Sequence, residues 1–337
     1  MSVPKSRLAA VFVVIVVVLV GGAAVAPYVL GSTSEPEPVT LENEQFQPAT
    51  ILPDETPEQG EISMGSDATG KTILVDVGHE NSVSKSKLEP LLSTLVENGH
   101  RVRFYRGQRA SLNESLRSAD AFLVVSPRQR YTNDELAGVE AFTDAGGRVL
   151  VMGDPPSVQV SGGLLFGRIQ PTAPRTTSLG STYGIAYGSG YLYNMEENDN
   201  NYQSIYATPA SGSGLADGVE RAVMREAVPL RTADGTRVLV GSQGTTLSTT
   251  RDTGQYAVVV RSGNVTAVGD TDFVSRKNAY DADNEVLLGN LADFLVDGDK
   301  RPGAPAKPGA DQPARPPASG GGGAAPPRTP APTPSPA

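Results

Sequence analysis

Short apolar runs alternate with helix-like patterns over much of the chain. Between the runs, apolar side chains recur at helical spacing, first from Leu88 to Val96 and again after a capping box formed by Thr132 and Glu135. Runs with few polar positions predict strands that are buried on both faces, and these lie at residues 72–77, 102–105, 121–125 and 148–152. Since helical segments connect such strands, the sequence predicts an α/β fold: a doubly wound parallel sheet with helices on both faces.

The pattern after residue 160 is less regular. A segment rich in Gly, Ser, Tyr and Asn covers residues 161–206. Strand-like runs follow at residues 219–224, 237–241, 256–261 and 265–269, and the turn Ser262-Gly263-Asn264 predicts a hairpin between the last two. Apolar side chains between Leu287 and Leu295 predict a closing helix.

A longer apolar run near the N-terminus predicts a transmembrane helix. Residues 8–30 carry no charge, and as a helix they would extend about 34 Å. Lys5 and Arg7 precede this run, whereas residues 31–70 contain many acidic side chains and no Lys or Arg. The positive-inside rule therefore predicts a single-pass protein of the cell membrane, with residues 1–7 in the cytoplasm and the bulk of the chain extracytoplasmic.

The same run has a second interpretation as a cleaved signal peptide. Ala24-Val25-Ala26 has the small-x-small pattern of a cleavage site. Two features favour the uncleaved anchor: the run is longer than a typical signal-peptide core, and Pro27 would follow the cut.

The two flanks of the expected globular domain, residues 71–300, differ from it in composition. Residues 31–70 combine acids with prolines and lack a sustained apolar period, which predicts an extended extracytoplasmic stalk. Residues 301–337 are rich in Pro, Gly and Ala and predict a disordered tail.

The composition of the chain limits the kinds of partner and site that the protein can have. The 37 acidic and 28 basic side chains give a net charge of -9, which argues against nucleic acid as a partner. The chain has no cysteine, so disulfides, thiolate metal sites and cysteine nucleophiles are excluded. With only two histidines, His79 and His100, a zinc site with three imidazoles is excluded as well, and no cofactor is expected.

Several acids and one imidazole follow predicted strands, at the edge where parallel sheets commonly bind ligands. These weak ligand or metal candidates are Asp76, His79, Asp154, Asp270 and Asp272. Carboxylates with an imidazole could bind a divalent cation, but acids after strands are also common turn formers and helix caps. Ser126 and Ser157 lie at similar positions without the Gly-x-Ser-x-Gly pattern of a nucleophile, so no catalytic residue is predicted.

The irregular segment holds six tyrosines among asparagines: Tyr183, Tyr187, Tyr191, Tyr193, Tyr202 and Tyr206. Exposed rings beside amides are typical of surfaces that bind sugars or proteins. Interior packing of the same rings is the alternative interpretation.

Several stretches together resemble a known family. ILVDVGHEN, LRSADAFLVVSP, TNDELAGVEAFTDAGGRVLVMGDPP and GDTDFVSRKNAYDADNEVLLGNLADFL are similar to the domain of unknown function 4350 family, akin to auxiliary subunits of gliding-motility-type ABC transporters. The resemblance implies a class I glutamine amidotransferase-like (flavodoxin-like) fold, whose enzymes carry a cysteine on the turn after the strand equivalent to VLVMG. Here that turn is Gly153-Asp154-Pro155-Pro156, so the resemblance implies the fold without the chemistry.

The leading hypothesis is a membrane-anchored extracytoplasmic domain without catalysis. It would act as an accessory or interaction subunit of a membrane complex, and the resemblance points to an ABC transporter. The alternatives are a metal-dependent hydrolase that uses the acids after the strands, and a cell-surface module that binds glycans or proteins.

Overall fold

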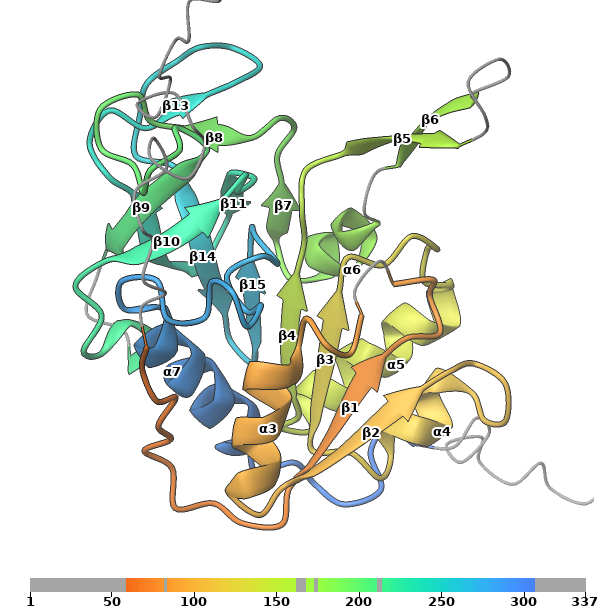
Figure 1. The fold of residues 1–337 in the computed structure, drawn as a ribbon. Coiled ribbons are helices and arrows are strands. Elements are labelled where there is room, and N and C mark those ends of the chain that lie inside the picture. Colours follow the sequence, from red (N-terminus) through yellow and green to blue (C-terminus); the bar gives the residue numbers. More distant parts are fainter. Residues whose placement is uncertain (1–58, 82–83, 162–167, 173–174, 211–213, 307–337) are drawn as a thin grey trace, which may run out of the picture. The chain divides into compact units, whose positions relative to one another are not determined.

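The structure is a computed structural model that describes residues 59–306 except for residues 82–83, 162–167, 173–174 and 211–213. Its centre is one sheet of 11 strands (Figure 1). The strands are β1 (Thr72–Asp76), β2 (Arg101–Tyr105), β3 (Ala121–Val125), β4 (Arg148–Met152), β7 (Ile185–Tyr187), β9 (Ser204–Pro209), β10 (Ala222–Arg225), β11 (Leu230–Thr232), β12 (Thr236–Gly241), β14 (Ala257–Ser262) and β15 (Val265–Val268). Nine of them follow in the order β10-β9-β12-β14-β15-β4-β3-β1-β2, and β11 pairs with β14 and β7 beside this path.

The sheet has a parallel part and an antiparallel part. The strands β2, β1, β3, β4 and β15 all run in one direction. The direction changes at the hairpin between β14 and β15, and the pairs that β14, β12, β9 and β10 form along the path are antiparallel. Two further pairs of strands lie outside this sheet, β5 (Ser157–Ser161) with β6 (Arg168–Thr172) and β8 (Leu192–Tyr193) with β13 (Thr246–Leu247).

Helices cover both faces of the parallel part. One face packs against α3 (Glu89–Glu97) and α7 (Asn284–Val296), and the other packs against α4 (Leu112–Leu116), α5 (Asn133–Asp144) and α6 (Thr176–Thr182) (Figure 1). The strands are buried on both faces because their side chains alternate between two cores. In β1, Ile73 and Val75 join the core beneath α3 and α7, whereas Leu74 joins the other.

The beginning of α5 is the most strongly specified helix end. The Thr132 hydroxyl accepts from the Glu135 backbone N–H, and the Glu135 carboxylate accepts from the Thr132 backbone N–H at 2.9 Å. This is the capping box that the sequence predicts. It fixes the position of the loop that precedes α5, which contributes to the site described below.

The predicted fold class, a doubly wound parallel sheet of the class I glutamine amidotransferase-like type, is wrong. The sheet is mixed, and the described connections between β9 and β15 contain no α-helix. The physical reason is that the tight hairpin between β14 and β15 can link only antiparallel neighbours, so the direction of the sheet changes there, and β12, β9 and β10 continue in antiparallel pairs.

Among the described residues, none of the helices has the length and apolar character that a membrane crossing requires. The transmembrane helix predicted for residues 8–30 lies outside the described residues. So do most of the predicted stalk and residues 307–337 of the predicted tail.

The domain includes chain on both sides of residues 71–300. On the N-terminal side, Ile62, Met64 and Ala68 pack against the core beneath α7. The Asp293 carboxylate of α7 accepts from the backbone N–H groups of residues 65 and 66 at 2.8 and 3.0 Å. On the C-terminal side, the Arg301 N–H donates to the Ala145 carbonyl at 2.8 Å. Residues 60–68 and the first residues of the predicted tail are therefore parts of the domain.

Candidate functional site

The carboxyl ends of β1, β3, β4 and β15 meet at one edge of the sheet, which we call the crest. All five predicted site residues lie there, and the structure divides them between two clusters. The Asp76 cluster comprises Asp76, His79, Tyr131 and Glu135. The Asp154 cluster comprises Lys87, Ser126, Asp154, Asp270, Thr271 and Asp272. No hydrogen bond or ion pair among the described residues joins the His79 side chain to Asp154.

The Asp76 carboxylate is buried and is surrounded by donors. It accepts from the Gly78 backbone N–H at 3.0 Å, from His79 Nδ1 at 2.9 Å and from the Tyr131 hydroxyl. The Tyr131 ring stacks on the imidazole with 4.0 Å between centroids. The second nitrogen of the imidazole, His79 Nε2, lies 3.5 Å from a carboxylate oxygen of Glu135, the residue that caps α5. The imidazole thus connects the end of β1 to the beginning of α5.

The charges of this cluster favour a protonated imidazole. Burial lowers the pKa of His79, but the hydrogen bond and the charge of Asp76, together with Glu135, outweigh it, so the pKa is raised above 6.5. Burial and the neighbouring Asp76 raise the pKa of Tyr131, which stays a neutral donor. Only 5% of the His79 surface is exposed, so its ring is a poor base for an external substrate.

Asp154 joins β4 to the neighbouring loops. One of its oxygens accepts from the Thr271 backbone N–H at 2.8 Å, and the other accepts from the Thr271 and Ser126 hydroxyls at 2.7 and 2.9 Å. Lys87 donates to the Thr271 hydroxyl at 2.8 Å and pairs with Asp272. Thus the protein itself supplies the partners of Asp154.

Asp270 is the most perturbed acid of the crest. It is fully buried, and its two oxygens accept from the backbone N–H groups of Arg225 and Asp272 at 2.9 and 2.6 Å. Burial raises the pKa of Asp270 to about 8, and the charges of Asp154 and Asp272 act in the same direction. A carboxyl group with this pKa is largely protonated at neutral pH.

Neither cluster has the arrangement that the metal hypothesis requires. Within the part of the chain that the structure describes, no group of three or more His, Asp or Glu side chains is placed to hold a metal ion. Ser126 has a positive φ of 40°, which is unusual for a serine, but it is fully buried and its hydroxyl donates to Asp154 instead of to an imidazole. A fully buried hydroxyl is not accessible to a substrate, so Ser126 is poorly placed to act as a nucleophile.

Sequence reasoning missed Lys87, Tyr131 and Thr271. Tyr131 carried a usable signal, because it directly precedes the N-cap Thr132, where a large apolar residue often packs against the first turn of a helix. Lys87 and Thr271 carried none, since they belong to loops almost 200 residues apart that only the folded sheet brings together.

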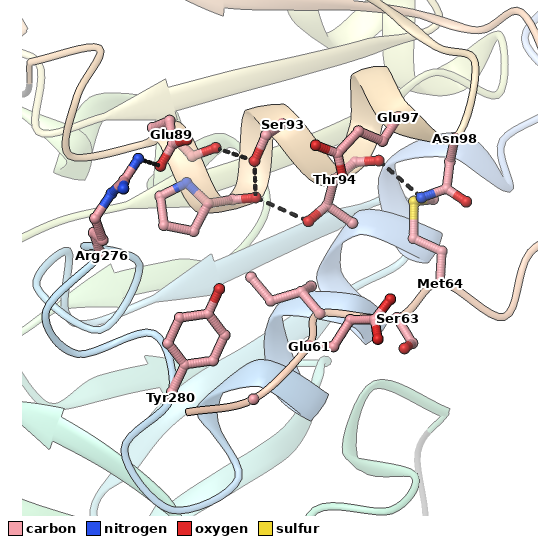
Figure 2. A pocket seen from close by; sticks show the side chains of 13 residues that line it. Glu61, Ser63, Met64, Glu89, Ser93, Thr94, Glu97, Asn98, Arg276 and Tyr280 are labelled. Atoms are coloured by element: carbon pink, nitrogen blue, oxygen red, sulfur yellow. Dashed lines mark hydrogen bonds and ion pairs between the residues drawn. The ribbon is translucent and has the colours of Figure 1, made fainter. Parts of the chain in front are cut away.

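A groove of about 620 Å³ lies between α3, residues 60–64 and the side chains of Arg276 and Tyr280 (Figure 2). Its lining is polar, but the hydroxyls of Ser93 and Thr94 donate to carbonyls of α3 itself at 2.8 and 2.9 Å. Arg276 pairs with Glu89 at 2.8 Å. None of the five predicted site residues lines this groove.

The tyrosines of the irregular segment divide between interior and surface. Tyr187 donates to the Val151 carbonyl at 2.9 Å, and Tyr183 is within 3.1 Å of the Thr143 hydroxyl, so both serve packing. Tyr193 and Tyr202 instead form an edge-to-face pair with 6.2 Å between centroids, and Tyr202 is 45% exposed. Interior packing is therefore the role of Tyr183 and Tyr187, whereas the binding interpretation of the exposed rings stays a prediction.

Comparisons with known proteins place the fold and the family. The structure is similar to the mmIFT52 N-terminal domain, with a TM-score of 0.53 and 13% identity over 68% of this chain and 100% of that one. A ThuA-like protein from Bacteroides uniformis follows, with a TM-score of 0.42 and 11% identity over 73% of this chain and 99% of that one. At these identities the first likeness shows the fold alone. No curated protein matches the chain. The sequence profile of the family described as "Domain of unknown function (DUF4350)" matches residues 91–292, and the chain belongs to this family.

Proposed function

We propose that this protein is a membrane-anchored extracytoplasmic domain that acts without catalysis, as an accessory or interaction subunit of a membrane complex. The observation that carries the proposal is the state of the crest, where the protein's own donors satisfy Asp76 and Asp154. An active site leaves polar groups directed at a substrate. Here these groups bind each other and join loops.

A hydrolase needs a nucleophile, and neither a cysteine nor Ser126 can supply one at the crest. Cysteine is absent from the chain, and Ser126 is buried against Asp154. Asp270 could donate a proton as a neutral acid, but no part of its surface is exposed. The hydrolase alternative would therefore need a rearrangement of the loops after β4 and β15.

The anchor rests on the sequence of residues 8–30, which lie outside the described residues, and the orientation rests on the charges that flank this run. A domain held at a membrane meets partners at a high effective concentration, so modest contacts suffice for association. An ABC transporter is the partner class that the family resemblance suggests. The likeness to solved structures adds no partner.

The test is purification of the tagged full-length protein from its native membranes after mild chemical cross-linking. We expect a membrane protein to be recovered in a fixed stoichiometric ratio to the domain. The matched control is the Asp154→Asn variant, which perturbs the crest and should retain the same partner at the same ratio. If the wild type is recovered without any membrane protein, the proposal is wrong. A partner that is lost with Asp154→Asn while the domain stays folded would indicate that the crest itself binds.

A further inference from the structure

The loop between β8 and β9, residues 194–203, presents an apolar side chain to solvent. Met195 is 70% exposed, the most exposed large apolar side chain of the described residues. Tyr202 lies in the same loop, is 45% exposed and packs edge-to-face on Tyr193. A single exposed methionine is unremarkable in itself, so the inference depends on how the loop is held and on its charge.

Asn194 fixes the conformation of this loop from within. Its side chain is buried, and its Oδ1 accepts from the backbone N–H groups of Glu196 and Glu197, both at 3.0 Å. Its Nδ2 donates to the Ser242 hydroxyl at 3.2 Å and to the Gln243 carbonyl at 2.8 Å. The backbone N–H of Asn194 also donates to the Tyr202 carbonyl at 2.8 Å, which closes the loop.

These hydrogen bonds order the backbone around Met195 before any partner binds. Association loses less conformational entropy when the contact residues are already ordered. The methionine side chain itself stays adaptable and can fit an irregular apolar pocket. This combination is typical of an anchor residue in an interface.

The charge next to Met195 indicates the chemistry of the partner. The carboxylates of Glu196 and Glu197 are exposed, and neither forms an ion pair with another of the residues that the structure describes. Nearby Asp199 differs, because it pairs with Arg225 at 3.0 Å. Arg221 lines a small pocket together with both glutamates but forms no ion pair with them. Two adjacent carboxylates without an ion-pair partner, next to an apolar tip, are complementary to an apolar pocket bordered by Lys or Arg.

We propose that the loop of residues 194–203 is the docking element of this domain, and that Met195 inserts into an apolar, basic-rimmed pocket of a protein partner. The proposal rests on the proposed interaction function and names the surface that performs it. A glycan is the less suitable occupant, because the most exposed side chain of the loop is Met195, which has no aromatic face on which a sugar could stack. The loop alone is smaller than a stable interface, so it supplies the anchor of a larger contact.

The test places a photo-reactive phenylalanine analogue at position 195 of the full-length protein, with irradiation in native membranes. The matched control is the same residue at position 96, because Val96 is also apolar and is 54% exposed on α3. We expect the protein that co-purifies with the domain to be cross-linked from position 195 and not from position 96.

A second arm tests the charge. The double variant Glu196→Lys, Glu197→Lys should reduce the yield of the adduct at least tenfold, and Met195→Ala should do the same in co-purification, whereas Val96→Ala should leave co-purification unchanged. Asn194 accepts from the backbone of these glutamates and not from their side chains, so the charge reversal leaves the loop intact.

The outcomes separate the two proposals. Equal adducts from both positions, adducts on lipid or glycan alone, or a yield that survives charge reversal would overturn the docking assignment and leave the interaction function in place. The same holds if the partner co-purifies and position 195 gives no adduct. Failure to recover any membrane partner would instead refute the interaction function, and the docking assignment with it.

Discussion

The burial of Asp270 leads to a quantitative prediction about how the free energy of unfolding depends on pH, because its carboxyl group is fully buried in the folded protein. Its pKa is raised from 3.8 to about 8 by burial first and then by the charges of Asp154 and Asp272. The folded protein therefore holds a proton between these two pH values that the unfolded chain has released. Stability must fall as pH rises through this window and become level above it.

The magnitude follows from the size of the shift. A tenfold change in proton affinity corresponds to about 1.4 kcal/mol, so raising the pKa from 3.8 to about 8 gives roughly 5 to 6 kcal/mol over the whole window. Part of the decline above pH 6.5 belongs to His79, whose raised pKa acts with the same sign. The stabilisation of the folded protein by His79 is complete below pH 6.5, and it is lost as the pH rises through the pKa of His79 in the folded state.

The perturbation is Asp270→Asn, which removes the titrating group and keeps its shape. The amide can accept only one of the two backbone hydrogen bonds that Asp270 accepts, from Arg225 or from Asp272. We therefore expect a constant loss of about 1 to 3 kcal/mol at low pH, together with a much shallower decline toward pH 8. The variant should match or exceed the wild type at the alkaline end.

The assay is urea denaturation of the purified full-length protein in detergent at a series of pH values between 4.5 and 8.5. Since the chain has no tryptophan, far-ultraviolet circular dichroism is the suitable signal. The variant His79→Gln provides the control, because it should remove only the part of the decline above pH 6.5 that His79 contributes. Parallel stability curves for wild type and Asp270→Asn would refute the reasoning, since they would show that Asp270 does not titrate in this window.

Three further predictions concern the crest, the ends of the domain and its orientation. Because His79 and Asp154 belong to separate clusters, His79→Ala and Asp154→Ala should each cost about 1 to 3 kcal/mol, and a double-mutant cycle should be additive within about 0.5 kcal/mol; a larger coupling would indicate a shared ligand. Deletion of residues 307–337 should leave the melting temperature unchanged, whereas deletion of residues 301–337 should lower it by about 2 to 4 °C because contacts of Ala145 and Arg117 are lost; equal effects would contradict this. Protease added to intact, wall-stripped cells should digest the domain, and full protection would overturn the predicted orientation.

The local elements could be predicted because their signals are local. The runs at residues 121–125 and 148–152 are strands, and the capping box at Thr132 begins a helix. The pairing of the later strands could not be predicted in this way, since β9 pairs with β10 and β12 through contacts that no nearby residue determines. The predicted hairpin around Gly263 was nevertheless a sign that the sheet is mixed. β15 pairs parallel with β4, so a hairpin that joins β15 to β14 makes the next strand antiparallel.

The crest was predicted as a region, but its internal arrangement was not. The rule that the ends of parallel strands share one edge correctly brought Asp76 and Asp154 to the crest. It could not separate them into two clusters, because that depends on which loop donors reach which carboxylate. Tyr131 and Thr271 decide this, and a hydroxyl in a loop has no distinctive pattern in a sequence.

The proposed function implies that the crest carboxylates hold the fold together and bind no ligand. The most direct measurement is the melting temperature of the full-length protein in detergent after treatment with a chelator, followed by addition of millimolar Mg²⁺, Ca²⁺, Mn²⁺ or Zn²⁺. We predict the same melting temperature in all of these conditions. A ligand present at about 100 times its dissociation constant would contribute roughly 2.7 kcal/mol, which is a rise of several degrees. Such a rise in the wild type, absent from both Asp154→Ala and His79→Ala, would contradict the account and favour a metal-dependent hydrolase.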